Sequence, residues 1–161
     1  MKGIEINENL FSMVFCGGCF DLFHKCQGKQ SVTPNLIIKA LEFFHLPLFV
    51  FMRENGTDIN AKDQHYLTAL HFAAENGHLS VVELLFNQKA HINAKKICWV
   101  FRFNYTPLHY AAMEGHLCFV EYLVNQKAEI NAKNQEGKTP LRLSSENGKS
   151  NVVEFLKSIQ E

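Results

Sequence analysis

The stretch TPLHYAAMEGH, residues 106–116, carries most of the information about how this chain folds. Thr106 is a good helix N-cap, because a threonine side chain can satisfy one of the first free N–H groups of a helix. Pro107 suits the first helical position, where its missing N–H is not needed. Gly115 suits the left-handed residue that ends a helix. The stretch therefore predicts one short helix with a defined start and a defined end.

The same pattern occurs twice more, as TALHFAAENGH at residues 68–78 and as TPLRLSSENGK at residues 139–149. Thr106 and Thr139 lie 33 residues apart, whereas Thr68 and Thr106 lie 38 residues apart. Internal repetition with a period in this range is typical of solenoid proteins. One copy therefore carries five extra residues.

A second apolar segment with helical spacing follows the first two copies, at residues 81–85 and 120–124. Gly77, Gly115 and Gly148 are expected to end the first helix of each copy. Two such short helices cannot bury their apolar faces alone, so the copies are expected to stack and to bury those faces jointly.

The TPLHYAAMEGH motif and its recurrence at about 33 residues resemble ankyrin repeats. The resemblance implies an all-α ankyrin-repeat solenoid of helix-turn-helix units joined by β-hairpin-like loops. The expected units are a degenerate capping repeat at 34–62, repeats at 63–95 and 96–133, and a C-terminal capping repeat at 134–161. Residues 1–33 precede them as an N-terminal extension of uncertain structure.

The resemblance also implies a function, that of a non-catalytic scaffold or adaptor. Such an array binds a partner protein through its hairpin tips and the face formed by its first helices. The family positions that usually face partners correspond here to Gln64, His65, Leu67, Glu75, Asn76, Tyr105, Met113, Glu114, Gln135, Glu136, Lys138, Glu146 and Asn147.

The five extra residues fall in the segment KICWVFRFNY, where a normal repeat has a tight polar turn. It contains Trp99, Phe101, Arg102 and Phe103, and aromatic residues and arginine dominate interface energetics. One interpretation is an apolar finger that grips a partner. The alternative is that the segment folds back and covers the Phe-rich surface beside it. A third is that the segment is an artefact of the gene assignment.

Repeated histidines fall on two positions of the pattern, His71 with His109 and His78 with His116. Such repetition favours structural hydrogen bonds to threonine and to the backbone over metal binding or catalysis. The sequence has no HExxH or GxSxG motif and no clustered pair of carboxylates. We therefore expect no enzyme activity, no cofactor and no metal.

The N-terminal segment offers a second, different hypothesis. Cys16, Cys19, His24 and Cys26 are four zinc-competent side chains within eleven residues. Their spacing is C-x2-C-x4-H-x-C, and one residue between His24 and Cys26 is too short for usual tetrahedral zinc. Ordinary free thiols are therefore the preferred interpretation, and a zinc-regulated module is the alternative.

Charge and composition exclude several classes of partner. The chain of 161 residues has 16 Lys+Arg and 16 Asp+Glu, so its formal net charge is zero. Because affinity for nucleic acid or for anionic membranes needs clustered cations, neither is expected. Five cysteines, an odd number, and the lack of a secretory signal predict an intracellular, cytoplasmic or nuclear protein. We expect a monomer.

Overall fold

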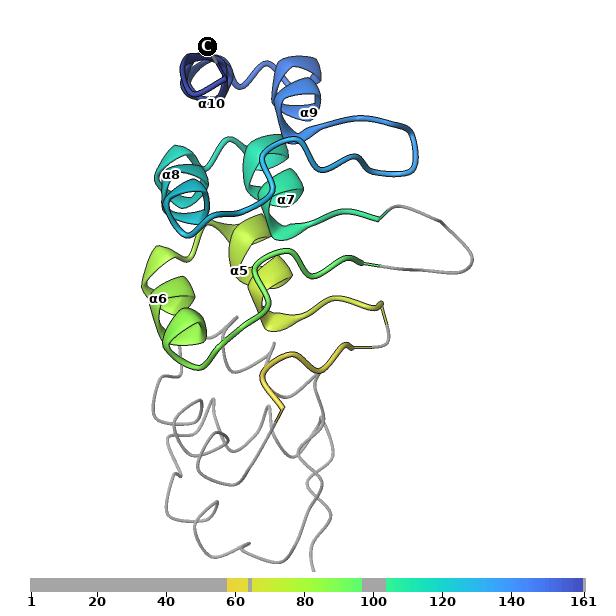
Figure 1. Cartoon of the computed structure of the whole chain (residues 1–161), viewed down its shortest axis with the longest axis vertical. Helices are drawn as coiled ribbons and strands as arrows, with labels where there is room; N and C mark the ends of the chain where they lie inside the picture. Colours follow the sequence, from red (N-terminus) through yellow and green to blue (C-terminus); the bar gives the residue numbers. More distant parts are fainter. Residues whose placement is uncertain (1–57, 64, 97–103, 161) are drawn as a thin grey trace, which may run out of the picture.

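A computed structural model of the chain describes residues 58–63, 65–96 and 104–160. The described part contains three helix pairs, with the labels used in Figure 1. The first helices of the pairs are α5 (Ala69–Asn76), α7 (Pro107–Glu114) and α9 (Pro140–Glu146). The second helices are α6 (Leu79–Asn87), α8 (Leu117–Asn125) and α10 (Ser150–Ser158).

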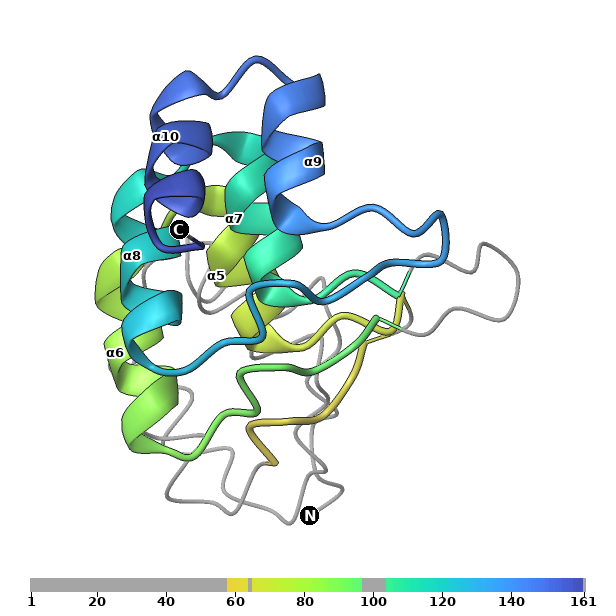
Figure 2. The ribbon, with the colours of Figure 1, turned by 45° about the horizontal axis from the view of Figure 1, so that its top comes forward.

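The helices form two stacked layers. In Figure 1, α5, α7 and α9 lie above one another in one layer, and α6, α8 and α10 lie in the other. The loops that connect one pair to the next project away from the helices on the side of the first layer (Figure 2). We call the first layer the inner helices and the second layer the outer helices. The predicted all-α solenoid of helix pairs joined by hairpin-like loops is confirmed.

Small residues allow the inner helices to approach one another closely. Ala73 and Ala74 of α5 and Ala111 and Ala112 of α7 are all fully buried. The core also contains large aliphatic and aromatic side chains from the outer helices. Among them are Leu85, Phe119, Leu123 and Leu156, each 1% exposed or less. Each copy therefore depends on its neighbours for burial, as the repeat pattern predicts.

The predicted helix ends hold for two of the three inner helices. Gly77 ends α5 and Gly115 ends α7, both in the left-handed region at φ +72° and +86°. In contrast, α9 ends one position earlier, with Asn147 at its C-cap and Gly148 following at φ +68°. Gly148 keeps the repeat position of Gly115 and its left-handed conformation, and only the end of the helix is one residue earlier.

The outer helices α6 and α8 end differently from the inner ones. Lys89 and Lys127 stand just after them at φ +61° and +65°, a region that favours glycine. The turn is closed by the N–H of Ala90 bonding to the Leu85 carbonyl, and by the N–H of Ala128 bonding to the Leu123 carbonyl. These bonds hold each lysine in a conformation that is unfavourable for a residue with a Cβ.

We therefore expect Lys127→Gly to raise the free energy of unfolding by about 0.5–1 kcal/mol, since glycine removes the left-handed strain. Lys157→Gly is the matched control, because Lys157 lies in the right-handed last turn of α10. Glycine there should lower the free energy of unfolding by up to about 1 kcal/mol. Urea melts of both variants test the pair, and the same sign for both would contradict this account of the strain.

Candidate partner-binding face

Two short hydrogen bonds at the start of α5 and α7 build the framework beneath the candidate face. The Nδ1 atom of His71 accepts from the Thr68 hydroxyl at 2.8 Å and from the Thr68 backbone N–H at 3.3 Å. His109 repeats this arrangement with Thr106, at 2.8 Å and 3.1 Å. A ring nitrogen that faces a backbone N–H must act as an acceptor, so Nδ1 carries no proton.

The opposite nitrogen of each ring connects one repeat to the next. The Nε2 atom of His71 lies 3.1 Å from the carbonyl oxygen of Tyr105, and that of His109 lies 3.2 Å from the carbonyl oxygen of Lys138. Because a carbonyl oxygen can only accept, each Nε2 carries the proton and donates it. Both imidazoles are fully buried and neutral. They fix the backbone of Tyr105 and Lys138, two of the residues predicted to face a partner.

Both pKa values follow from this burial. Burial lowers the pKa of His71 to about 4, and the Lys62 and Lys96 ammonium groups add to the effect, while the bond to Tyr105 opposes it. Burial also lowers the pKa of His109. Protonation of Nδ1 would in addition make it a donor, so that two N–H donors, one from the histidine ring and one from the threonine backbone, would face each other.

The hairpin tips share one turn geometry. At the first tip, the Asp63 side chain accepts from the N–H groups of His65 and Leu67, at 2.8 and 2.7 Å. At the last tip, the Asn134 side chain accepts from the N–H of Lys138 at 2.8 Å. The backbone N–H of Asp63 and of Asn134 then closes each tip on the carbonyl of Leu67 and of Lys138.

The middle tip keeps this closure although it contains the insertion. The N–H of Lys96 bonds to the Tyr105 carbonyl at 2.9 Å, and this pair forms an antiparallel bridge. Lys96 thus stands where Asp63 and Asn134 stand in the other tips. Residues 97–103, which contain the insertion, lie outside the described residues, and the Lys96–Tyr105 bridge is the described part of this tip.

The residue before the closing position has a positive φ at all three tips. These residues are Tyr66 at +61°, Asn104 at +44° and Gly137 at +73°. Glycine and, to a lesser degree, asparagine tolerate this region, whereas tyrosine does not. Tyr66 is also 38% exposed. Sequence reasoning missed this strained and exposed aromatic residue, although its alignment with Gly137 could have indicated it.

An aromatic cluster lies at the foot of the middle tip. The Tyr105 ring packs edge-on against the rings of His109 and Tyr110, with centroids 5.6 and 5.5 Å apart. The Lys96 ammonium donates to the Tyr110 hydroxyl at 3.2 Å and lies 5.9 Å from the centre of that ring. Burial and the nearby Glu75 raise the pKa of Tyr110, so this hydroxyl stays protonated. Lys96 and Tyr110 were not among the predicted site residues.

The two unpaired carboxylates of the face lie near this cluster. Glu75 and Glu114 are exposed at the C-terminal ends of α5 and α7. Burial raises the pKa of Glu75, Glu114 adds to that rise, and Lys96 opposes it. Among the described residues, neither carboxylate forms an ion pair.

Charges on the last repeat are paired instead. The Lys138 ammonium lies 3.0 Å from Glu136 and 3.0 Å from Glu146, so it joins the hairpin tip to α9. The Arg142 side chain bonds to Glu146 at 2.8 Å. Hydrogen bonds from Lys138 and Arg142 lower the pKa of Glu146, and those to Glu136 and Glu146 raise the pKa of Lys138. The structure brings these three predicted residues, Glu136, Lys138 and Glu146, into one network.

The remaining predicted residues lie along the same face without forming one cluster. His65 and Gln135 are exposed at tips, and Leu67 and Met113 are half-buried against the core. Asn76 and Asn147 are exposed and bond back to the carbonyls of Phe72 and Leu143. Five predicted residues lie outside the described part of the chain, namely Gln64, Trp99, Phe101, Arg102 and Phe103.

Comparison with known families assigns this geometry to a class. The family model for ankyrin repeats, in three copies, matches residues 19–96, 36–134 and 99–160. The chain belongs to the ankyrin repeat family. Ankyrin repeats are generally protein–protein interaction modules, and the family is typically non-enzymatic. A search of curated proteins found no match for the chain.

Two further observations are limited to residues 58–63, 65–96 and 104–160. No helix there is long and apolar enough to cross a membrane, and no group of three or more His, Cys, Asp or Glu side chains is placed to hold a metal ion. Cys16, Cys19, His24 and Cys26 lie outside these ranges, so both interpretations of that cluster stay predictions.

The buried histidines predict a dependence of stability on pH. The folded-state pKa of His71, about 4, lies below its ordinary value of 6.5, so the unfolded chain binds this proton first as pH falls. The stabilisation is complete above pH 6.5 and is lost between 6.5 and 4. The loss should reach about 1 kcal/mol near pH 5.5 and at most about 3 kcal/mol below pH 4 for this residue alone.

Urea melts at about pH 7.5 and pH 5.5, with His71→Asn as comparison, test this prediction. The variant is expected to be less stable at both values and to lose the part of the pH dependence due to His71. Glu75, whose pKa is raised, acts in the opposite direction and is present in both proteins. An NMR titration midpoint for His71 above pH 6 would refute the assignment.

Proposed function

We propose that the chain is a non-catalytic scaffold or adaptor that binds a partner protein through its hairpin tips and the inner helices α5, α7 and α9. The observation that carries the proposal is the contrast between a framework that repeats in space and hairpin tips in which most residue types change from copy to copy. The Thr–His bonds recur in two repeats with nearly equal distances. At the tips, His65, Tyr66 and Leu67 of the first copy are replaced by Glu136, Gly137 and Lys138 in the last, while Gln64 and Gln135 are the same residue type.

The chemistry of the face supports a protein partner. It combines half-buried apolar side chains at Leu67, Tyr105 and Met113 with unpaired carboxylates at Glu75 and Glu114. A mixture of aromatic and apolar anchors with charges around them is typical of protein interfaces. Lys96 and Tyr105, which lie on either side of the insertion in the sequence, form the bridge of the middle tip, and we therefore include Trp99 and Phe101 in the proposed face.

The proposal includes four finer statements. The chain performs no catalysis, binds no nucleic acid or membrane, acts as a monomer and works inside the cell, in the cytoplasm or nucleus. The supporting observations are the family assignment, the zero net charge and the odd number of cysteines. The alternative of a zinc-regulated module rests on Cys16, Cys19, His24 and Cys26, which lie outside the described residues.

Charge reversal on the inner helices tests the proposal. The tagged full chain is used to capture partners from cells of its source, and the affinity of each captured protein is then measured by calorimetry. Glu75→Lys with Glu114→Lys should weaken a partner at least about tenfold, since both charges lie on the face. The matched control is Glu83→Lys with Glu154→Lys, because both glutamates are exposed on outer helices.

The control variant should keep the affinity within about twofold. Its charge change is the same, so any effect of net charge alone appears in both proteins. Partner binding that depends on the outer pair and not on the inner pair would place the interface on the other layer and would refute the proposal.

Replacement of Tyr66 provides a second test, in which the free energy of unfolding should rise while the affinity for the partner falls. Tyr66→Gly should raise the free energy of unfolding by about 0.5–1 kcal/mol, because glycine accepts the positive φ without strain. It should also weaken the partner, because an exposed aromatic ring at a tip is lost. Lys127→Gly is the control: it relieves the same kind of strain on the outer layer.

Thermal melts and calorimetry on both variants give the two quantities. Lys127→Gly should stabilise the chain without changing the affinity. Equal affinity of the Tyr66→Gly variant and the original chain would exclude Tyr66 from the interface and would leave its strain unexplained.

A further inference from the structure

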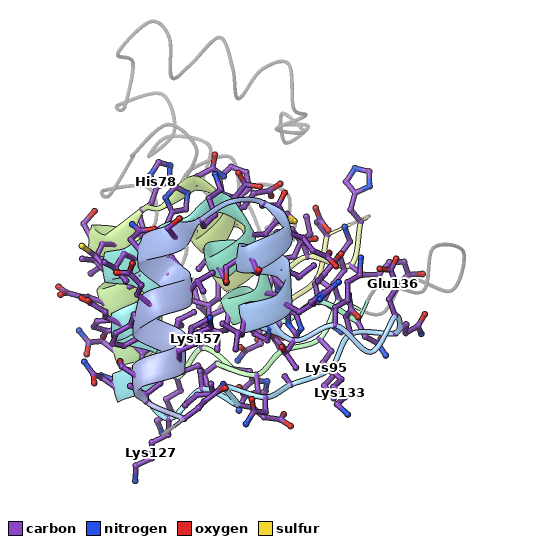
Figure 3. All side chains as sticks on the ribbon, turned by 90° about the horizontal axis from the view of Figure 1, so that it is seen from above. His78, Lys95, Lys127, Lys133, Glu136 and Lys157 are labelled. Carbon is purple, nitrogen blue, oxygen red and sulfur yellow. The ribbon has the colours of Figure 1, made fainter. Side chains whose placement is uncertain are left out.

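A row of lysines lies on a different side of the stack from the proposed face. Lys95 and Lys133 occupy the same position in consecutive repeats, and both are exposed. In the view down the stack, Lys95, Lys133 and Lys127 all project from one side of the molecule, opposite His78 (Figure 3). We call Asn93, Lys95, Lys127, Asn131 and Lys133 the lysine edge.

The cations of the lysine edge have no counterions in the described part of the chain. Lys95, Lys127 and Lys133 form no ion pair there, whereas Lys138, at the last hairpin tip, binds two carboxylates. Lys62, at the same repeat position as Lys95, donates to the Lys95 carbonyl at 3.0 Å and so leans along the edge. Three ammonium groups are therefore left to solvent.

The side-chain oxygens of the two asparagines on this edge are already hydrogen-bonded within the stack. The Oδ1 of Asn93 accepts from the N–H of Glu129 at 2.9 Å, and the Oδ1 of Asn131 accepts from the side chain of Gln160 at 3.0 Å. Both residues are exposed, and their Nδ2 groups have no partner among the described residues. These asparagines therefore present N–H donors to solvent, beside the lysine ammonium groups.

We propose that the lysine edge binds an acidic, extended segment of a protein. Carboxylates are acceptors that match both the ammonium groups and the asparagine N–H donors. The five residues of the edge include no arginine and no aromatic ring, which are the usual platforms for phosphate and for stacked bases. Glu129 is exposed between Lys127 and Asn131 in the chain, and its carboxylate opposes an anionic ligand at that point of the edge.

This inference goes beyond the proposed function, because it adds a second surface with its own ligand chemistry. The inner helices carry the unpaired carboxylates Glu75 and Glu114, so the two surfaces select ligands of opposite charge. A single partner with an acidic segment could contact both, but neither surface requires the other.

The test uses the full chain, labelled with ¹⁵N, and a capped peptide of about 12 alternating Glu and Ser residues as the probe. In about 20 mM NaCl, the side-chain amide signals of Asn93 and Asn131 should shift in a saturable way, together with the backbone amides of Lys95 and Lys133. Raising NaCl to about 300 mM should weaken binding severalfold, because exposed charges are screened.

Two double variants locate the effect. Lys95→Gln with Lys133→Gln should weaken the peptide roughly fivefold, as expected for the loss of two exposed charge contacts. Lys149→Gln with Lys157→Gln removes the same charge elsewhere, and glutamine keeps the γ-methylene, one of the three Lys149 carbons that lie nearest Gly115. That control should stay within about twofold of the original chain.

Three outcomes would overturn the inference. One is an equal loss of affinity in both double variants, which would indicate net charge alone. Another is a set of shifted signals confined to the inner helices. The third is tighter binding of a single-stranded RNA of about 12 nucleotides, or of vesicles containing phosphatidylserine, than of the peptide. None of these bears on the charge-reversal test of Glu75 and Glu114, so the two proposals fail separately.

Discussion

A single neutral imidazole on α5, and another on α7, joins the helix to the hairpin of the next repeat, and the rest of the structure depends on this contact. Without a donor, the buried side of the Tyr105 or Lys138 carbonyl would lose its hydrogen bond, at a cost of about 1–3 kcal/mol each. His71 and His109 provide that donor, and the threonine before each helix fixes the ring by occupying Nδ1. The same ring therefore caps a helix, stacks two repeats and positions a residue of the candidate face. It can do all three only while it is uncharged.

The charges are balanced along the sequence but separated in space. Equivalent residues of successive repeats lie side by side, so a residue type that recurs at one position becomes a row on the surface. Lys95 and Lys133 form such a row, and Glu75 with Glu114 lies on the inner helices. The count of 16 positive and 16 negative residues is therefore a poor guide to the local field. In a solenoid, the position of a charge within the repeat determines which partner it faces.

Most of the fold could be predicted from the sequence, because the signals for it are local. A threonine before proline and a glycine eight residues later define a helix in a window of a dozen residues, and α7 begins and ends as expected. The structural role of His71 and His109 was also predictable from their repetition. The Lys96–Tyr110 contact was not, because it joins a loop to a helix of the same repeat across an insertion that hides the register. The strain at Tyr66 depends on a backbone angle that no propensity reports. The outward positions were inferred by resemblance alone, and their energetic roles depend on a partner that the sequence does not contain.

The bonds from the histidines to the hairpins of the following repeats give the stack a direction. Each imidazole on α5 and α7 donates toward the C-terminal neighbour, and the series stops at α9, where Arg142 occupies the histidine position and turns to Glu146 instead. The two ends of the described array are thus chemically unlike: the α9 end offers no buried imidazole donor to a following hairpin. A designer who appended another ankyrin unit after α10 would place histidine at position 142, because α5 and α7 use that position to donate to the carbonyl of the next hairpin. The residue at the position of His71, His109 and Arg142 therefore determines which repeat can follow another.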